Sequence, residues 1–147
     1  MTVLMTILKW LLVLAAAVYF GGLVVLFFKQ RSMLFPIPTV TRTAPEAAGF
    51  PEAEEHILTT ADGEKVIVWH VPAKPGHAVI LYFPGNGDFL AGGVSRFRAM
   101  TSDGTGLVAL SYRGYAGSSG APSEYGILQD AAAQMTKYQT QPVACTR

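Results

Sequence analysis

Hydrophobic and polar residues are distributed unevenly, with one long apolar segment at the amino end and short apolar runs separated by turns after it. Residues Trp10–Phe28 carry no charge. At about 1.5 Å per residue, a helix over them nearly spans the roughly 30 Å hydrocarbon core of a bilayer, and residues 3–8 extend it if Lys9 reaches the interface. The pattern predicts a transmembrane anchor of residues 1–31, with the lipid bilayer as its partner.

A cleaved signal peptide is the alternative interpretation of this segment. Signal peptides have a basic start, a shorter apolar core and small residues at the cleavage site. Met1–Leu8 contains no basic residue, and the small residues Ala15–Ala17 lie inside the apolar stretch. A retained single-pass membrane anchor is therefore favoured. The basic residues that follow it favour a cytoplasmic location for the next domain, and they are Lys29, Arg31 and Arg42.

The chain after the anchor begins with a change of composition. Residues 32–53 are rich in proline, threonine and alanine, which predicts a linker because proline interrupts both helices and central strands. The next two runs, 55–60 and 64–71, contain many β-branched residues and flank an aspartate-glycine turn at Ala61–Gly63. These runs predict a β-hairpin.

Strands and helices are then expected to alternate. The continuous apolar run His77–Phe83 is typical of a strand covered on both faces, and it is expected in the centre of the sheet. Apolar residues at helical spacing between Asp88 and Ser102, weakened by Gly92–Gly93, predict a helix, and Leu107–Tyr112 predicts another strand. A strand, helix and strand in this order form one right-handed crossover with parallel strands.

A second helix is predicted after Pro122 and Ser123, where apolar residues share one face: Ile127, Leu128, Ala131, Ala132, Met135 and Tyr138. The alternation ends there, because residues 137–147 contain no apolar run of strand length. The expected organisation is therefore an α/β domain of residues 54–136 followed by an irregular tail of residues 137–147.

Composition excludes several classes of function. The net charge of +1 provides no basic surface for nucleic acid. The single cysteine, Cys145, forms no internal disulfide and is more typical of a bystander than of a nucleophile. The histidines His56, His70 and His77 lack the spacing of a zinc motif, so no metal site is predicted.

Two glycine-rich turns follow the strands of the predicted crossover. The first is Pro84–Gly87 (PGNG) and the second is Tyr112–Gly120 (YRGYAGSSG). With these turns in tandem, the segment from about Glu54 to Ala133 resembles the α/β-hydrolase superfamily, in particular its membrane-anchored branch of serine-aminopeptidase-like or abhydrolase-domain proteins. The resemblance implies the amino-terminal half of an α/β-hydrolase sheet, a β-hairpin plus a parallel strand–helix–strand unit, preceded by one transmembrane helix.

The resemblance also implies a role for the first turn. α/β Hydrolases stabilise an oxyanion with backbone N–H groups, one of which comes from the loop after the third strand. By position, this donor is the amide of Asn86 or Gly87, and Gly85 belongs to the structural part of the loop. Pro84 stands where the family has a histidine. An alternative interpretation is that Gly85–Gly87 is only a tight strand-to-helix turn.

A glycine-rich turn after a strand also occurs in dinucleotide-binding folds. Gly85 and Gly87 match the first two glycines of that motif, but Leu90 occupies the place of the third. No acidic residue ends the next strand either. No cofactor is therefore predicted.

Arg113 and Gly114 come early in the second turn, and Arg113 is predicted to clamp neighbouring carbonyl groups rather than to bind substrate. Further along, Gly117–Ala121 imitates the Gly-x-Ser-x-Gly motif but ends in alanine. A nucleophilic serine sits directly on the strand-to-helix turn, whereas Ser119 lies well past the strand end at Tyr112. Ser119 is therefore predicted to be a loop residue, and no catalytic residue is assigned.

The order of residues bears on activity. In α/β hydrolases the triad runs serine, acid, histidine, and the last histidine, His77, precedes every serine of the candidate loops. The chain is therefore expected to be the amino-terminal portion of a membrane-anchored hydrolase of esters, thioesters or acyl chains, truncated before its nucleophile and inactive by itself. The alternatives are a non-catalytic membrane protein that binds a protein partner at an unpaired sheet edge beside Leu107–Tyr112, and a fragment from a damaged reading frame.

Overall fold

A computed structural model of the chain describes residues 2–37 and 39–139. The chain forms two compact units, Met1–Leu34 and Phe35–Arg147. The first unit is the helix α1 (Thr2–Leu34), which has no buried residue along its described length. α1 is long and apolar enough to cross a membrane, a property that it shares with signal sequences. The helix continues past the predicted end of the anchor.

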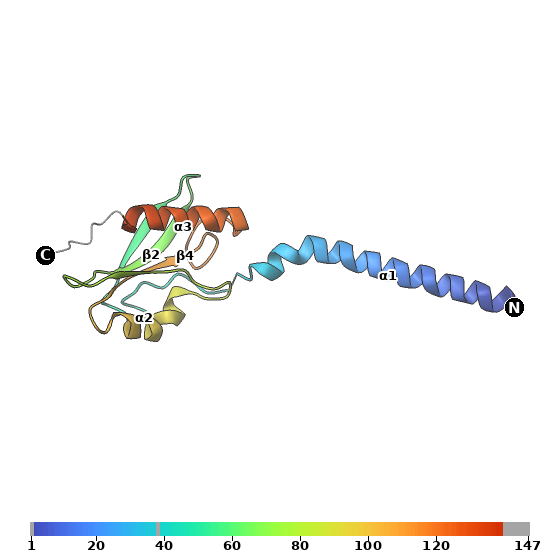
Figure 1. Cartoon of the computed structure of the whole chain (residues 1–147), viewed down its shortest axis with the longest axis horizontal. Coiled ribbons are helices and arrows are strands. Elements are labelled where there is room, and N and C mark those ends of the chain that lie inside the picture. The colour runs from blue at the N-terminus through green and yellow to red at the C-terminus, as the bar shows by residue number, and fades with distance from the viewer. Residues whose placement is uncertain (1, 38, 140–147) are drawn as a thin grey trace. The chain divides into compact units, whose positions relative to one another are not determined.

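The second unit contains a four-stranded mixed sheet with the order β1-β2-β4-β3 (Figure 1). β1 (Glu54–Thr59) and β2 (Lys65–Val71) form an antiparallel hairpin. β2 also pairs antiparallel with β4 (Gly106–Ser111), and β4 pairs in parallel with β3 (Val79–Tyr82). The predicted hairpin and the predicted parallel strand–helix–strand unit are confirmed.

The position of β4 corrects two expectations. β4 lies between β2 and β3 and all its residues are buried, whereas β3 is an edge strand with partly exposed residues. It is therefore wrong that His77–Phe83 forms the central strand and that the edge beside Leu107–Tyr112 is unpaired. The crossover through α2 (Val94–Thr101) places β4 between β3 and the hairpin, so that β4 pairs with β3 on one side and with β2 on the other. An apolar run by itself does not encode this order.

Helices cover both faces of the sheet (Figure 1). One face is covered by α3 (Glu124–Gln139) and the other by α2 with the preceding 3-10 turn η1 (Leu90–Gly93). Alternate residues of β2 point to the two layers, as a strand requires. The α3 layer is the cluster of Leu58, Val66, Val68, Val108, Leu110 and Tyr138, and the α2 layer includes Phe50, Ile67, Trp69, Leu90, Phe97, Leu107 and Ala109.

The segment before β1, which the sequence predicts to be a linker, contributes to the core. Phe50 is completely buried, and its ring centroid lies 6.3 Å from that of Trp69 and 6.2 Å from that of Phe97. A hydrogen bond of 2.7 Å from the backbone N–H of Phe50 to the carbonyl oxygen of Pro45 closes the turn that positions the ring. The compact unit therefore uses residues upstream of position 54.

Two helices differ from their predicted extents. The helix expected over residues 88–102 divides into η1, which contains Gly92 and Gly93, and α2, which begins at Val94, as the low helix propensity of glycine favours. The ring of Phe97 occupies the space that a Cβ atom on Gly93 would need, at 2.5 Å. α3 includes the first residues of the predicted tail, and the rest of that tail, with Cys145, lies outside the described residues.

Candidate functional site

Two loops meet at the carboxyl ends of the parallel strands β3 and β4. The first loop (residues 83–89) follows β3 and the second loop (residues 112–121) follows β4. Parallel strands end at the same edge of a sheet, so these loops are neighbours. Tyr115 joins them, because its buried side chain donates a 2.9 Å hydrogen bond from its hydroxyl to the carbonyl oxygen of Asn86.

Asn86 and Gly87 lie at the exposed tip of the first loop. The loop closes with a 3.1 Å hydrogen bond from the backbone N–H of Asp88 to the carbonyl oxygen of Gly85. Among the residues that the structure describes, the N–H of Gly87 donates to no backbone acceptor. Gly87 has no positive φ, and a Cβ atom there would meet nothing within 4 Å. This fold therefore does not itself require glycine at position 87, whereas the close approach of a ligand would.

Tyr82, the last residue of β3, connects the first loop to α2. Its hydroxyl donates to Oδ2 of Asp88 at 3.3 Å, and the guanidinium of Arg96 contacts both of these side chains. Burial raises the pKa of Tyr82, so its phenol stays protonated and remains a donor at neutral pH. These contacts hold the end of the first loop against the helix.

A small cavity lies beside the two loops, and its lining includes Phe89 and Ala116 together with Trp69 and Glu55. Its volume is about 10 Å³, which is room for about one water molecule. The indole N–H of Trp69 donates to Oε2 of Glu55 at 3.3 Å and fixes one wall. The cavity does not accommodate an acyl group.

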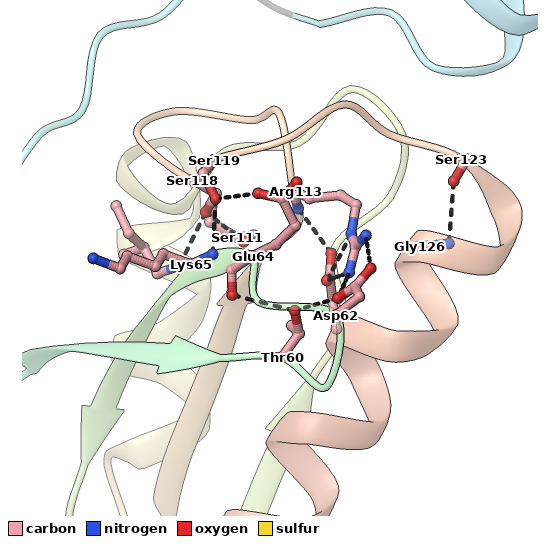
Figure 2. Close-up of polar contacts among 12 residues, drawn as sticks. Thr60, Asp62, Glu64, Lys65, Ser111, Arg113, Ser118, Ser119, Ser123 and Gly126 are labelled. Atoms are coloured by element: carbon pink, nitrogen blue, oxygen red, sulfur yellow. Dashed lines mark hydrogen bonds and ion pairs between the residues drawn. The ribbon is translucent and has the colours of Figure 1, made fainter.

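Arg113 is the centre of a polar network behind the second loop (Figure 2). Its backbone N–H and its Nε donate to the two carboxylate oxygens of Asp130 in α3, at 2.8 and 2.9 Å. Its Nη1 and Nη2 donate to Asp62 in the β1–β2 turn, at 2.6 and 3.0 Å. Arg113 and Asp130 are buried. Arg113 therefore links three elements, and these partners are carboxylates instead of the carbonyl groups that the sequence suggests.

The charges of this network stabilise one another. Hydrogen bonds from Arg113, and after them the one from Thr60, lower the pKa of Asp62 far below its ordinary value. The hydrogen bonds to Asp62 and then to Asp130 raise the pKa of Arg113. Arg113 and Asp62 are consequently both charged at neutral pH.

Two glycines leave space for this arrangement. A Cβ atom on Gly126 of α3 would lie 2.6 Å from Cδ of Arg113, so the arginine crosses the helix where no side chain projects. Gly114 has a φ of +78°, and a Cβ atom there would lie 2.6 Å from Cδ of Pro122. Both positions therefore have a steric reason for glycine.

Ser118 and Ser119 bind the backbone of neighbouring strands (Figure 2). The hydroxyl of Ser118 accepts from the N–H of Ile67 at 3.0 Å and donates to the carbonyl oxygen of Ser111 at 2.8 Å. The hydroxyl of Ser119 accepts from the N–H of Lys65 at 2.7 Å and donates to the carboxylate of Glu64. Within residues 2–37 and 39–139, neither hydroxyl is hydrogen-bonded to a histidine, the usual base of a serine nucleophile.

The structure separates the predicted site residues into two environments. Asn86 is tied to the second loop by Tyr115, whereas the side chain of Arg113 points to its two carboxylates. The sequence predicted no role in the site for three residues, Tyr115, Asp62 and Asp130. Asp130 left a signal in the sequence, because it is an acidic residue beside the apolar face of a predicted helix, but the other two are defined only by distant partners.

No family model matches the chain. Among curated proteins, the chain is 27% identical over 115 residues to the uncharacterized protein Rv2307c of Mycobacterium tuberculosis, covering 77% of this chain and 41% of that protein. It is 31% identical over 108 residues to the lysophosphatidylserine lipase ABHD12 of Danio rerio, covering 59% of this chain and 28% of the lipase. The chain thus spans about two fifths of the mycobacterial relative and less of the fish enzyme.

Solved structures show the fold. The esterase Pf2001 of Pyrococcus furiosus matches with a TM-score of 0.54 at 20% identity, over 71% of this chain and 42% of the esterase. An α/β hydrolase of Novosphingobium aromaticivorans matches with a TM-score of 0.53 at 18% identity, over 60% of this chain and 32% of that protein. The chain therefore has part of the α/β-hydrolase fold, which confirms the fold that its two glycine-rich turns predict.

Proposed function

We propose that these residues are the amino-terminal part of a membrane-anchored serine hydrolase, and that the first loop supplies one backbone donor of its oxyanion hole. The observation that carries this proposal is the hydrogen bond from Tyr115 to the carbonyl oxygen of Asn86. It fixes an exposed loop against the loop of the neighbouring parallel strand. Oxyanion donors must be held rigidly before the reaction, because their benefit depends on preorganisation.

The backbone N–H of Gly87 fits the proposed role. It is exposed, it has no backbone acceptor among the described residues, and its glycine has no steric reason within this fold. In α/β hydrolases the second donor is the residue after the nucleophile, on a later strand. The first loop would therefore bind the oxygen of the tetrahedral intermediate, and the nucleophile and base would come from other parts of a complete hydrolase.

The proposed substrates are esters, thioesters or other acyl compounds presented near a bilayer. The names of the similar proteins include an esterase and a lysophosphatidylserine lipase, which supports hydrolysis of an acyl bond. α1 has the length and composition to hold the domain at a membrane. Lys29 and Arg31 follow the apolar residues and support a cytoplasmic orientation.

By themselves, these residues are proposed to be catalytically inert. The second-loop serines serve as backbone ligands, and an oxyanion donor without a nucleophile and base has no covalent step to assist. The full chain in detergent micelles should not be labelled by a fluorophosphonate probe and should not hydrolyse p-nitrophenyl acetate above background. Labelling that disappears in the Ser119→Ala variant would contradict this part of the proposal.

The oxyanion role requires a complete protein that contains this segment. Sequencing the transcript past Arg147 is expected to reveal a continuation with Gly-x-Ser-x-Gly. In that protein, Gly87→Pro removes the N–H, whereas Gly87→Ala keeps it and has space for the added Cβ atom. We expect Gly87→Pro to lower kcat about 100-fold or more and Gly87→Ala to retain most of the activity. Equal losses in the two variants would identify the loop as a simple turn.

A second candidate is a non-catalytic membrane protein that binds a partner chain along β3. β3 has one strand neighbour among the described residues, and Val79 on it is 38% exposed. An unpaired strand edge is a template for another chain. Association of the full chain in detergent that Val79→Lys abolishes would support this candidate. A chain that is monomeric by sedimentation and unfolds cooperatively on heating would contradict it.

A further inference from the structure

Three potential metal ligands gather on the β1–β2 hairpin, away from both loops. Glu54 and His56 are two residues apart on β1 and therefore share one face of the strand. His70 of β2 lies directly opposite Glu54 in the antiparallel register. One ligand atom from each of these side chains lies within 4.8 Å of the others. The carboxylate oxygen of Glu54 and Nε2 of His56 are 3.2 Å apart.

We propose that Glu54, His56 and His70 bind a divalent transition-metal ion such as Zn²⁺. Imidazole and carboxylate are common zinc ligands at about 2.0–2.2 Å, which places neighbouring ligand atoms of a tetrahedral site about 3.3 Å apart. The Glu54–His56 pair already has this separation, at 3.2 Å. His70 needs a side-chain adjustment of up to about 1.5 Å, because the three atoms fall within 4.8 Å of one another.

The hairpin gives this site a rigid base and an open side. All three residues are paired in the β1–β2 ladder, which fixes their backbones. The side chains of Glu54 and His56 are 69% and 32% exposed, so an ion has access from solvent. Three protein ligands leave at least one coordination position for water or an added ligand, which is the arrangement of exchangeable zinc sites and not of closed structural ones.

A buried tyrosine packs against one member of the cluster, and its hydroxyl lacks a partner. The ring of Tyr138 lies against His70, with the ring centroids 5.3 Å apart. Tyr138 is 8% exposed, and its hydroxyl has no hydrogen-bond partner within the described part of the chain. Buried polar groups in native proteins nearly always have a partner. A bound water or ion is the kind of group that satisfies such a hydroxyl.

The sequence alone does not predict this cluster. Its motif is a Glu-x-His pair on one strand, and the third ligand comes from the neighbouring strand, so no continuous zinc motif exists. The third histidine of the chain, His77, lies outside the cluster and is exposed. It provides a matched control.

The experiment is a metal titration of the full chain in detergent micelles, without a histidine tag and with Cys145→Ser to remove the free thiol. Calorimetry with Zn²⁺ should show one bound ion per chain. Co²⁺ should give visible absorption bands that Zn²⁺ abolishes by displacement. His56→Ala and Glu54→Gln should each weaken binding at least about 10-fold, and His77→Ala should leave the affinity unchanged.

Two outcomes would contradict the proposed metal site. Absence of saturable binding, or binding that His77→Ala weakens as much as His56→Ala does, would overturn the proposal. Circular dichroism and thermal unfolding of each variant separate loss of ligand from loss of fold. If His70→Ala unfolds, the partly exposed position His56 still gives the answer, and Zn²⁺ should raise the Tm of the parent chain but not of His56→Ala. These readouts are independent of any hydrolase activity.

Discussion

Arg113 binds Asp130 from two different parts of the same residue, with its backbone N–H on Oδ2 at 2.8 Å and its side-chain Nε on Oδ1 at 2.9 Å. The carboxylate of Asp130 therefore fixes both the direction of the chain as it leaves β4 and the rotamer of the arginine. The other end of the guanidinium reaches Asp62 in the β1–β2 turn. This arrangement connects α3 to the sheet at the point where the second loop begins.

Removing the charge of Asp130 should strongly destabilise the domain. Asp130 is completely buried, and Asp130→Asn breaks its buried ion pair with Arg113, which costs about 3 kcal/mol or more, although the guanidinium keeps Asp62 as a partner. Urea unfolding of the full chain in detergent, followed by Trp69 fluorescence in a Trp10→Phe background, measures the loss. Glu52→Gln, which alters an exposed ion pair with Arg98, should change the free energy of unfolding little. Equal effects of the two variants would contradict the proposed importance of burial.

The contribution of Asp62 should depend on pH. Arg113 lowers the pKa of Asp62 in the folded state, so the contribution is complete above the ordinary aspartate pKa of about 4. It is lost as pH falls from there through the depressed folded-state pKa. Thermal unfolding from pH 7 to pH 2 should show Asp62→Asn less stable than the parent chain at pH 7, with the two curves converging in acid. Parallel curves would show that the Asp62–Arg113 contact contributes no pH-dependent stability.

Gly126→Ala should destabilise the domain although alanine is the better helix former by about 1 kcal/mol. The added Cβ atom would lie 2.6 Å from Cδ of Arg113, so the arginine must leave its place between the two carboxylates. A double-mutant cycle with Arg113→Ala isolates this cause. In the Arg113→Ala background, the same Gly126→Ala change should become neutral or stabilising. A penalty that persists there would assign the clash to other atoms.

Tyr115→Phe should loosen the first loop. The change removes the hydrogen bond to the carbonyl oxygen of Asn86, which contributes about 0.5–1.5 kcal/mol. Hydrogen exchange followed by mass spectrometry should show faster exchange in peptides that cover residues 83–89. Tyr125→Phe, at a position that is 70% exposed, is the matched control. Unchanged exchange of the first loop in Tyr115→Phe would remove the main support for a preorganised oxyanion donor.

Local patterns predicted the elements of this fold well. The run 64–71 is rich in β-branched residues and predicts a hairpin strand, and the structure places Val66 and Val68 in one layer and Ile67 and Trp69 in the other. The aspartate-glycine turn and the crossover unit follow from patterns among residues that are close together in the sequence. The positions of Asn86 and Gly87 at a strand end could be read from the same local signals, whereas their role in an oxyanion hole stays a prediction.

Contacts between distant segments could not be predicted in this way. The apolar run at His77–Phe83 has the same character in an edge strand as in a central one, because the hydrophobic pattern reports burial of faces and not the number of strand neighbours. Phe50 likewise lies in a segment with the composition of a linker. Only its packing on Trp69 and Phe97 shows that it belongs to the hydrophobic core.

The sequence alone determined an apolar amino-terminal helix, a hairpin and a parallel crossover that ends in two glycine-rich loops, because these depend on residues near one another in the chain. Only the tertiary structure decided that β4 is central, that Arg113 binds Asp62 and Asp130, and that Glu54, His56 and His70 meet. The physical reason is that strand order and side-chain partners across the sheet are set by packing of the whole domain, which no local run of residues specifies.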